Sequence, residues 1–308
     1  MTEFQELWAA SAKSDLEHLA SSRRGDIVYR PRNVLGHLLL KLARRHIFTY
    51  AIEDRPKERW LQQAMTQTGT HILDIGVRTG YHAHLFKKRG KRVYGLDIAS
   101  VYIDHCLKSA SIDYGAVCDV ERDQIPVPAD FACGLPTYYD AIFAGEIIEH
   151  LLDARRFFYK LARVCRPGGC LIVTTPNLAY LGNRFRLLLG RDLHPLTMDR
   201  GVTGHQHIRV YTCRLLGRLL AEVGFRITQV AGDGLLLDLR RALDTVRISS
   251  QRSTLLTDSQ PPLLTVPFSG TLLPRLGLVL YVQAHKGSDH ADPLPQAGNT
   301  RCPSRGCS

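Results

Sequence analysis

The sequence lacks the features that would place the chain in a membrane or in an oxidising compartment. None of its apolar runs approaches the roughly 20 residues that a membrane-spanning helix needs. Its eight cysteines are scattered singly, without a C-x-x-C pair. This usage favours reduced, packed thiols and a cytoplasmic protein. The stretch from Met1 to Glu6 has neither a basic leader nor an apolar core, so we expect no secretory signal.

Positive charge is in excess, and the excess is concentrated near the N-terminus. The chain has 308 residues, 44% of them hydrophobic, and a formal net charge of +11, which favours acidic partners. Between Arg23 and Arg45, seven Lys/Arg residues stand against Asp26 alone. Apolar residues at helical spacing accompany them, so we expect residues 1–60 to be helical. Such basic amphipathic helices either pack on the core as a lid or lie on an anionic membrane surface.

The stretch His71–Gly80 (HILDIGVRTG) has the pattern of a buried strand that runs into a glycine-punctuated turn. The turn opens a predicted helix over residues 81–89, and free N–H groups at such a helix start suit an anionic ligand group. The next predicted strand, Arg92–Asp97, ends in a carboxylate. Asp97 follows the start of the motif by about 20 residues, the spacing at which an acidic side chain meets ribose hydroxyls in nucleotide-binding βαβ units.

Strands and helices alternate from residue 71 to residue 177, which predicts a mostly parallel sheet covered on both faces. Ligands bind such sheets outside the carboxyl ends of the strands. Further strands are predicted at 114–119, 139–145, 170–175, 225–230 and 276–285, and loops at 125–136 and 180–204. Polar residues stand at the predicted strand ends: Asp74, Asp97, Asp119, the segment 146–150, and Asn177.

Four blocks, present in order, resemble the class I S-adenosylmethionine-dependent methyltransferases. They are Leu73-Asp74-Ile75-Gly76 with Thr79-Gly80; Gly95-Leu96-Asp97; Glu146 to Asp153 (EIIEHLLD); and Arg166-Pro167-Gly168-Gly169 followed by a strand and Thr175-Pro176-Asn177. The E-x-x-E-H part of the third block is most similar to small-molecule enzymes related to the ubiquinone O-methyltransferases.

The resemblance implies an α/β fold with a seven-stranded, mostly parallel sheet of Rossmann-like methyltransferase type. The last strand would be antiparallel, and an N-terminal helical extension would precede the sheet. The implied organisation is a helical lid at 1–60, a methyltransferase domain at 61–286 with an insertion at 235–273 before the last strand, and a disordered tail at 287–308.

The same resemblance implies that S-adenosylmethionine is the cofactor. The implied binding residues are Asp74, Gly76 and Gly80 under the methionine moiety, Asp97 at the ribose hydroxyls, Asp119 and Val120 at the adenine edge, and Glu146 closing off the site. One residue departs from the family pattern, because Arg78 replaces the middle glycine of the G-x-G-x-G turn. Its side chain must point away from the methionine moiety or pair with the carboxylate of that moiety.

Methyl transfer from a sulfonium mainly requires alignment and exclusion of water, and a base is needed only when the acceptor is protonated. His150 is one candidate base, because the N-terminal end of a helix keeps an imidazole neutral; its alternative is a hydrogen bond to a neighbouring loop. His207, with His205, would line the acceptor pocket or tie its own loop to the sheet edge. Glu146, Glu149 and His150 match positions associated with a divalent cation in the ubiquinone O-methyltransferases, and metal dependence stays open.

The expected function is methyl transfer to a small-molecule acceptor, most readily at oxygen, with lipid-linked compounds and secondary metabolites among the options. Peripheral membrane contact would involve the basic N-terminal helices and the patch from Arg184 to Arg191. A nucleic-acid methyltransferase is one rival, but the N/D-P-P-Y/F block typical of base-nitrogen enzymes is replaced by Gly145-Glu146-Ile147-Ile148, so we do not expect a nucleic-acid partner. A non-catalytic binding scaffold with the same fold is the other rival.

Overall fold

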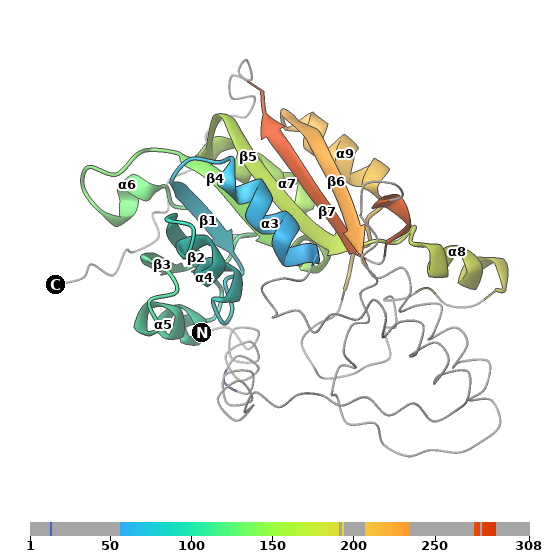
Figure 1. The fold of residues 1–308 in the computed structure, drawn as a ribbon, viewed down its shortest axis with the longest axis horizontal. Helices are drawn as coiled ribbons and strands as arrows, with labels where there is room; N and C mark the ends of the chain where they lie inside the picture. The colour runs from blue at the N-terminus through green and yellow to red at the C-terminus, as the bar shows by residue number, and fades with distance from the viewer. Residues whose placement is uncertain are drawn as a thin grey trace.

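A seven-stranded sheet forms the centre of the computed structural model (Figure 1), which describes Lys13 and residues 56–190, 193, 207–233, 274–277 and 279–287. The predictions for residues 1–55 other than Lys13, for the insertion at 235–273 and for the tail beyond 287 lie outside these residues. The strands are β1 (His71–Ile75), β2 (Arg92–Asp97), β3 (Tyr114–Val117), β4 (Tyr139–Gly145), β5 (Cys165–Pro176), β6 (Phe225–Asp233) and β7 (Val279–Lys286).

The strand order is β3-β2-β1-β4-β5-β7-β6. Strands β1 to β5 pair in parallel, and β7 runs antiparallel to both β5 and β6. This confirms the predicted fold class, including the reversed last strand. The order reverses between β1 and β4, and this switch point is where open α/β sheets bind ligands. At the same edge, Val279 pairs with both Pro176 and Asp233.

Helices cover both faces of the sheet because side chains on its central strands alternate in direction. On one face, residues such as Leu73 and Ile142 pack with Phe157 of α7 and Leu216 of α9. On the other face, Ile72 and its neighbours pack with α3, α4 and α5. Figure 1 shows α3 lying over the sheet and α7 and α9 behind it. The bounds are α3 (Pro56–Thr66), α4 (Tyr81–Lys87), α5 (Ser100–Lys108), α7 (Ala154–Val164) and α9 (Cys213–Glu222).

Side chains and glycines predictable from the sequence begin and end several helices. Asp153 accepts a hydrogen bond from the backbone N–H of Arg156 at 2.9 Å and so caps α7, and Thr212 caps α9 in the same way. Gly90 and Gly224 follow α4 and α9 with φ values of 73° and 84°. Only glycine adopts this left-handed conformation without strain, which explains why the helices stop there.

Two predicted loops contain a helix. Helix α6 (Pro128–Phe131) forms within 125–136, because Pro128 fixes a helical φ and the Asp130 carboxylate accepts the Val127 N–H at 2.9 Å. Helix α8 (Leu181–Leu188) forms within 180–204. Its leucines do not repeat at the spacing of a buried stripe, so the sequence carries little periodic signal for it. None of the described helices has the length and hydrophobicity to cross a bilayer.

Candidate functional site

The turn after β1 contains three residues in the left-handed conformation. Gly76, Arg78 and Gly80 have φ values of 69°, 45° and 76°. A Cβ added at Gly76 would lie 2.2 Å from Cδ1 of Ile147, and one added at Gly80 would lie 2.8 Å from Cβ of Ser111. Both positions therefore require glycine for packing as well as for backbone conformation.

Arg78, which replaces the middle glycine of the turn, has a left-handed backbone conformation. Its backbone N–H donates to Oδ2 of Asp97 at 3.0 Å, and its carbonyl oxygen accepts from the Cys106 thiol at 3.2 Å. The Arg78 residue is exposed. The departure from the family pattern has therefore left the turn and its link to β2 intact.

Two buried carboxyl groups lie beside this turn, at the ends of neighbouring strands. Burial raises the pKa of Asp97, while the N–H groups of Ala99 and Arg78, which donate to its two oxygens, oppose the rise. Burial, and then the charge of Asp97, raise the pKa of Asp74 to about 8; the backbone N–H of Ala83 opposes this rise. Each carboxylate oxygen can accept more than one hydrogen bond, so Asp97 retains capacity for hydroxyl donors.

Asp119 and Val120 lie in a tight turn just beyond β3. Oδ1 of Asp119 accepts the backbone N–H of Glu121 at 3.0 Å, and Oδ2 lies 3.6 Å from Nε of Arg122. Val120 is half-buried and packs against the main core. The structure thus places both residues just beyond the end of β3 and gives the Asp119 carboxylate a local structural role; the adenine contact implied by the resemblance stays a prediction.

Two residues that organise this region were not singled out from the sequence. The Glu121 carboxylate accepts the backbone N–H groups of Leu152 and Asp153, at 2.6 and 3.1 Å. Nζ of Lys160 donates to the carbonyl oxygens of Val120, Glu121 and Asp123. The signal that could have found Lys160 is its position among the apolar residues on the buried side of α7.

The segment after β4 contains a half-buried carboxyl group, Glu146, and a buried one, Glu149. Glu146 has a φ of 53° and an Oε1 atom that is buried without a hydrogen-bond partner among the described residues. Glu149, 1% exposed, accepts the Thr175 hydroxyl at 3.0 Å through Oε2, while its Oε1 has no partner within the same residues. Burial, and then the neighbouring Glu146, raise the pKa of Glu149 well above its usual range. Buried acceptors without donors are expected where a ligand or an ion binds.

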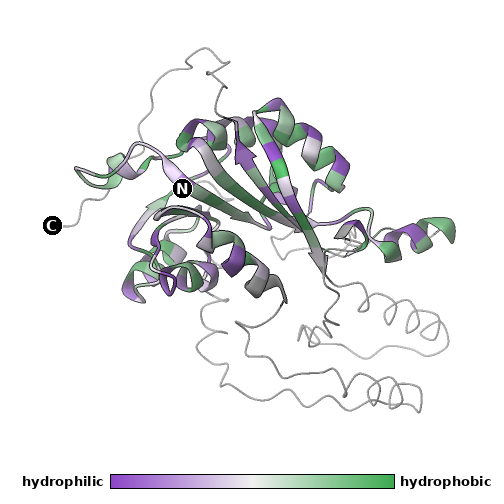
Figure 2. Ribbon diagram, turned by 45° about the horizontal axis from the view of Figure 1, so that its top comes forward, coloured by the Kyte–Doolittle hydropathy of each residue, from purple (hydrophilic) through white to green (hydrophobic). Residues whose placement is uncertain are grey.

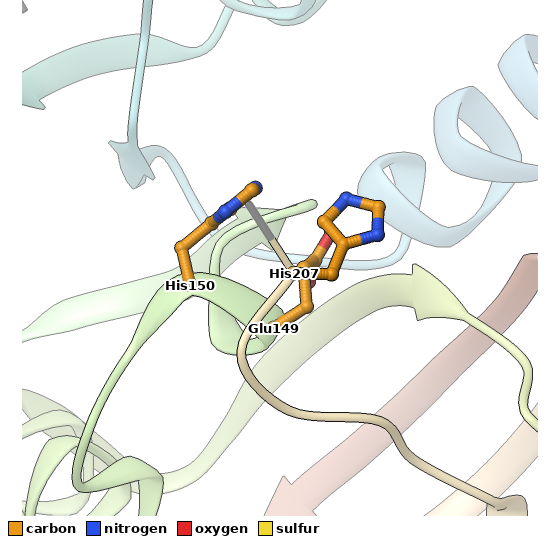
Figure 3. Close-up of side chains that lie close together, drawn as sticks. All are labelled: Glu149, His150 and His207. Atoms are coloured by element: carbon orange, nitrogen blue, oxygen red, sulfur yellow. The ribbon is translucent and has the colours of Figure 1, made fainter. Parts of the chain in front are cut away.

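Glu149 lies close to two histidines that come from separate segments (Figure 3). His150 follows it in the 3-10 helix η2 (Ile148–His150), and the rings of His150 and His207 have centroids 5.0 Å apart. One potential ligand atom from each of the three residues lies within 4.8 Å of the others. A carboxylate and two imidazoles form a donor set that suits a divalent transition metal. The structure therefore groups His207 with Glu149 and His150, whereas the sequence proposed Glu146 as the third ligand.

The segment that carries His207 is held against η2 and the residues after it. The backbone N–H groups of Ile208 and Arg209 both donate to the Glu149 carbonyl oxygen at 3.0 Å. The Arg209 guanidinium also donates to the carbonyl oxygens of Leu151 and Leu152. His207 is thus placed near His150 by backbone contacts, and its companion His205 lies outside the described residues.

Asn177, just after β5, joins the segments that lead to α8 and to β7. It is 1% exposed, and its Nδ2 donates to the carbonyl oxygens of Arg275 and Gly277 at 3.0 and 2.8 Å. Its Oδ1 accepts the backbone N–H of Ala179 at 3.0 Å. One buried side chain therefore fixes the entry to α8 and the approach to β7.

Comparison with known proteins supports the resemblance found in the four sequence blocks. The chain is 31% identical over 167 residues to the malonyl-[acyl-carrier protein] O-methyltransferase of Serratia marcescens, covering 52% of this chain and 62% of that protein. It is 28% identical over 174 residues to the ubiquinone biosynthesis O-methyltransferase of Chromobacterium violaceum, covering 54% and 68%. The match thus spans less than two thirds of the Serratia protein.

A solved structure and a family model extend the comparison. The crystal structure of the [4+2]-cyclase SpnF shares the fold, with a TM-score of 0.51, 14% identity and coverage of 93% of this chain and 96% of that one. The family model for a methyltransferase domain matches residues 42–230, which is more than half of the chain. The chain therefore belongs to the class I S-adenosylmethionine-dependent methyltransferases.

Proposed function

We propose that this protein transfers a methyl group from S-adenosylmethionine to an oxygen atom of a small-molecule acceptor. The observation that carries the proposal is the pairing of a left-handed turn after β1 with the buried Asp97 carboxylate at the end of β2. The turn after β1 lies beside the switch point between β1 and β4, and nucleotide-type ligands bind at such points. The two O-methyltransferase relatives support oxygen as the acceptor atom.

The residues at this edge fit the family's methyl donor. Asp97 has lone pairs for the ribose hydroxyls, and Glu146 offers a buried oxygen that lacks a partner among the described residues. Any side chain at Gly76 would meet Ile147, so the glycine lets Ile147 pack against the turn after β1. The donor supplies an activated methyl group, and the chain's task is to orient the acceptor and to exclude water.

His150 and His207 are the candidate bases for an acceptor hydroxyl, because both are half-buried and lie side by side near the carboxylate of Glu149. The same three residues would hold a divalent ion if the reaction uses one. In that case the ion would lower the pKa of a coordinated acceptor hydroxyl, and the histidines would serve as ligands rather than as bases.

We propose further that the acceptor is lipid-linked and that α8 brings the site to an anionic membrane. Phe185, Leu187, Leu188 and Leu189 are 52, 60, 81 and 67% exposed, and Arg184 and Arg186 lie among them on the helix. Figure 2 shows α8 standing away from the sheet, with hydrophobic colour toward its outer end. Exposed apolar residues beside arginines favour insertion into an anionic lipid surface.

Vesicle sedimentation at low salt tests the membrane part of the proposal. We expect binding to phosphatidylglycerol vesicles, weaker binding to phosphatidylcholine vesicles, and loss of binding in Leu188→Asp. Low salt is the condition that most favours electrostatic association. If the parent protein does not bind anionic vesicles under that condition, the membrane proposal is wrong, while the methyltransferase proposal is unaffected.

Binding of S-adenosylhomocysteine tests the methyltransferase part. At 100 times its dissociation constant the ligand should stabilise the parent protein by about 2.7 kcal/mol, and Asp97→Ala should remove most of that gain. Asp140→Ala is the matched control, because Asp140 accepts the His71 N–H and pairs with Arg166 at the opposite end of the sheet. Equal affinity in Asp97→Ala and parent would show that the nucleoside binds elsewhere. Binding without methyl transfer to a broad panel of acceptors would support the scaffold alternative.

A further inference from the structure

The buried ammonium of Lys160 donates hydrogen bonds to three backbone carbonyl groups of one loop. Lys160 is on α7 and is 8% exposed. Its Nζ lies 2.8 Å from the carbonyl oxygen of Val120, 2.9 Å from that of Glu121 and 2.7 Å from that of Asp123. Three carbonyl dipoles that point at one charge cannot rearrange without losing a charge-assisted hydrogen bond. These three hydrogen bonds therefore hold the loop 119–123 against α7.

A second contact, made by Glu121, holds the same loop. The Glu121 carboxylate accepts the N–H groups of Leu152 and Asp153, just beyond Glu149 and His150 in the chain. Lys160 thus joins the loop after β3 to α7, and Glu121 joins it to the residues just before α7. Movement of one segment would disturb the other.

The loop 119–123 follows β3, the strand that pairs with the end of β2 at Asp97. Asp97 pairs with Val117 across β2 and β3, and the N–H of Cys118 donates to the Asp97 carbonyl oxygen at 2.9 Å. Neighbouring strands lie about 4.8 Å apart. The inference takes the base of a nucleoside held at Asp97 to extend toward β3, against the loop that Lys160 fixes.

We propose that Lys160 is a positioning residue for the adenine end of the cofactor, acting through the loop 119–123. The inference rests on the proposed function, since it takes the nucleoside to lie on Asp97. Lys160 holds the loop in its binding conformation before the ligand arrives, so that little ordering cost is left to the binding step. Glu121 links the same loop to the segment that carries His150.

Lys286 provides a matched control for a purely structural lysine. Its Nζ donates to the carbonyl oxygens of Ala162 and Cys165 at 2.5 and 3.0 Å, beside the C-terminal end of the same helix α7. Lys160→Met and Lys286→Met each keep most of the aliphatic stem and strip an ammonium from backbone carbonyls. Both variants should lose stability, but only the first should lose affinity for the nucleoside.

The test measures S-adenosylhomocysteine and 5′-methylthioadenosine binding by calorimetry in the parent, Lys160→Met, Lys160→Arg and Lys286→Met. We expect Lys160→Met to weaken both ligands by the same factor, about tenfold, which corresponds to about 1.4 kcal/mol. The factor should be shared because the second ligand lacks the amino-acid moiety but keeps the adenine. Lys160→Arg should recover part of the loss, and Lys286→Met should stay within about twofold of the parent.

Hydrogen exchange supplies a readout that a general loss of stability would not produce. In Lys160→Met without ligand, the amides of 119–123 should exchange faster than in the parent, and bound S-adenosylhomocysteine should restore their protection. Glu121→Ala removes the hydrogen bonds to the Leu152 and Asp153 N–H groups and should also lose affinity, but less than Lys160→Met. If Lys160→Met does not fold, Glu121→Ala carries the test. Unchanged affinity in a folded variant at either position, or an equal loss in Lys286→Met, would overturn the inference. Failure of the parent to bind either ligand would instead overturn the proposed function.

Discussion

The backbone N–H of Arg78 donates to Oδ2 of Asp97 at 3.0 Å, and this bond ties the turn after β1 to the end of β2. The contact uses the main chain of Arg78, so it does not depend on which side chain is present. Its requirement is the left-handed conformation at residue 78, where φ is 45°. The sequence departure at this position therefore costs conformational strain but leaves the geometry of the site unchanged.

Replacing Arg78 by glycine should leave stability nearly unchanged. Relief of the left-handed strain gains about 1–2 kcal/mol, and the greater flexibility of glycine in the unfolded chain offsets about 0.5–1 kcal/mol of it. Urea unfolding should therefore show a change between zero and a small gain. A loss above 1 kcal/mol would mean that the attraction between the guanidinium and the Asp97 carboxylate contributes more than the strain that glycine relieves.

Gly80→Ala should be strongly destabilising in the same assay. Its φ is 76°, and the new Cβ would lie 2.8 Å from Cβ of Ser111 and 2.9 Å from the sulfur of Cys106. Left-handed strain and overpacking together should cost about 2–4 kcal/mol. Gly90→Ala is the control, since its φ is also positive but no atom lies within 4 Å of the added Cβ. Equal losses at the two positions would assign the whole effect to backbone strain.

Stability should fall with rising pH in a way that depends on Asp74. Folding raises the pKa of this carboxyl from 3.8 to about 8, so the folded state holds a proton that the unfolded state has released. The associated stability is complete below the unfolded-state pKa and is lost as the pH rises to the folded-state value, with a slope of at most about 1.4 kcal/mol per pH unit. Asp74→Asn should flatten the profile of urea midpoints between pH 5 and 8, whereas Asp104→Asn, at an exposed position on α5, should not. Parallel profiles for Asp74→Asn and the parent would show that Asp74 is ionised in the folded protein.

Asn177→Asp should destabilise the protein more than Asn177→Ala, although aspartate has nearly the same shape as asparagine. Alanine leaves the carbonyl oxygens of Arg275 and Gly277 without their donor, at a cost of about 1–3 kcal/mol. Aspartate additionally turns a negative oxygen toward both of them. Unfolding at neutral pH should rank parent, alanine and aspartate in that order of decreasing stability. The reverse order of the two variants would mean that water reaches this side chain.

The cluster of Glu149, His150 and His207 predicts stabilisation by a divalent transition metal. Zn²⁺ or Mn²⁺ should raise the unfolding midpoint of the parent, EDTA should reverse the rise, and His207→Ala should remove it, since each residue supplies one ligand atom. His84→Ala, on the exposed side of α4, controls for nonspecific histidine binding. An unchanged metal response in His207→Ala would favour the assignment of His150 and His207 as bases.

Much of the donor side of the site could be predicted from the sequence, because local patterns determine it. An apolar run that stops at Asp74 and two glycines, followed by a second run that stops at Asp97, is sufficient to order β1, its turn and β2. The rest of the site depends on contacts between distant segments. His207 approaches His150 through bonds such as those of the Ile208 and Arg209 N–H groups to the Glu149 carbonyl oxygen, and Lys160 meets Val120, which lies 40 positions away. No spacing rule predicts such contacts, and a lysine among apolar residues signals only that some partner exists.

The pairing of Val279 with both Pro176 and Asp233 has a consequence for how this protein can diverge from its relatives. The connection between β6 and β7 leaves and rejoins the sheet at neighbouring points, on the same edge as the end of β5. Loop-closure entropy grows slowly with length, so this connection can be lengthened, shortened or exchanged without altering the sheet. Changes in this connection and changes in the paired strands are therefore under separate constraints during evolution.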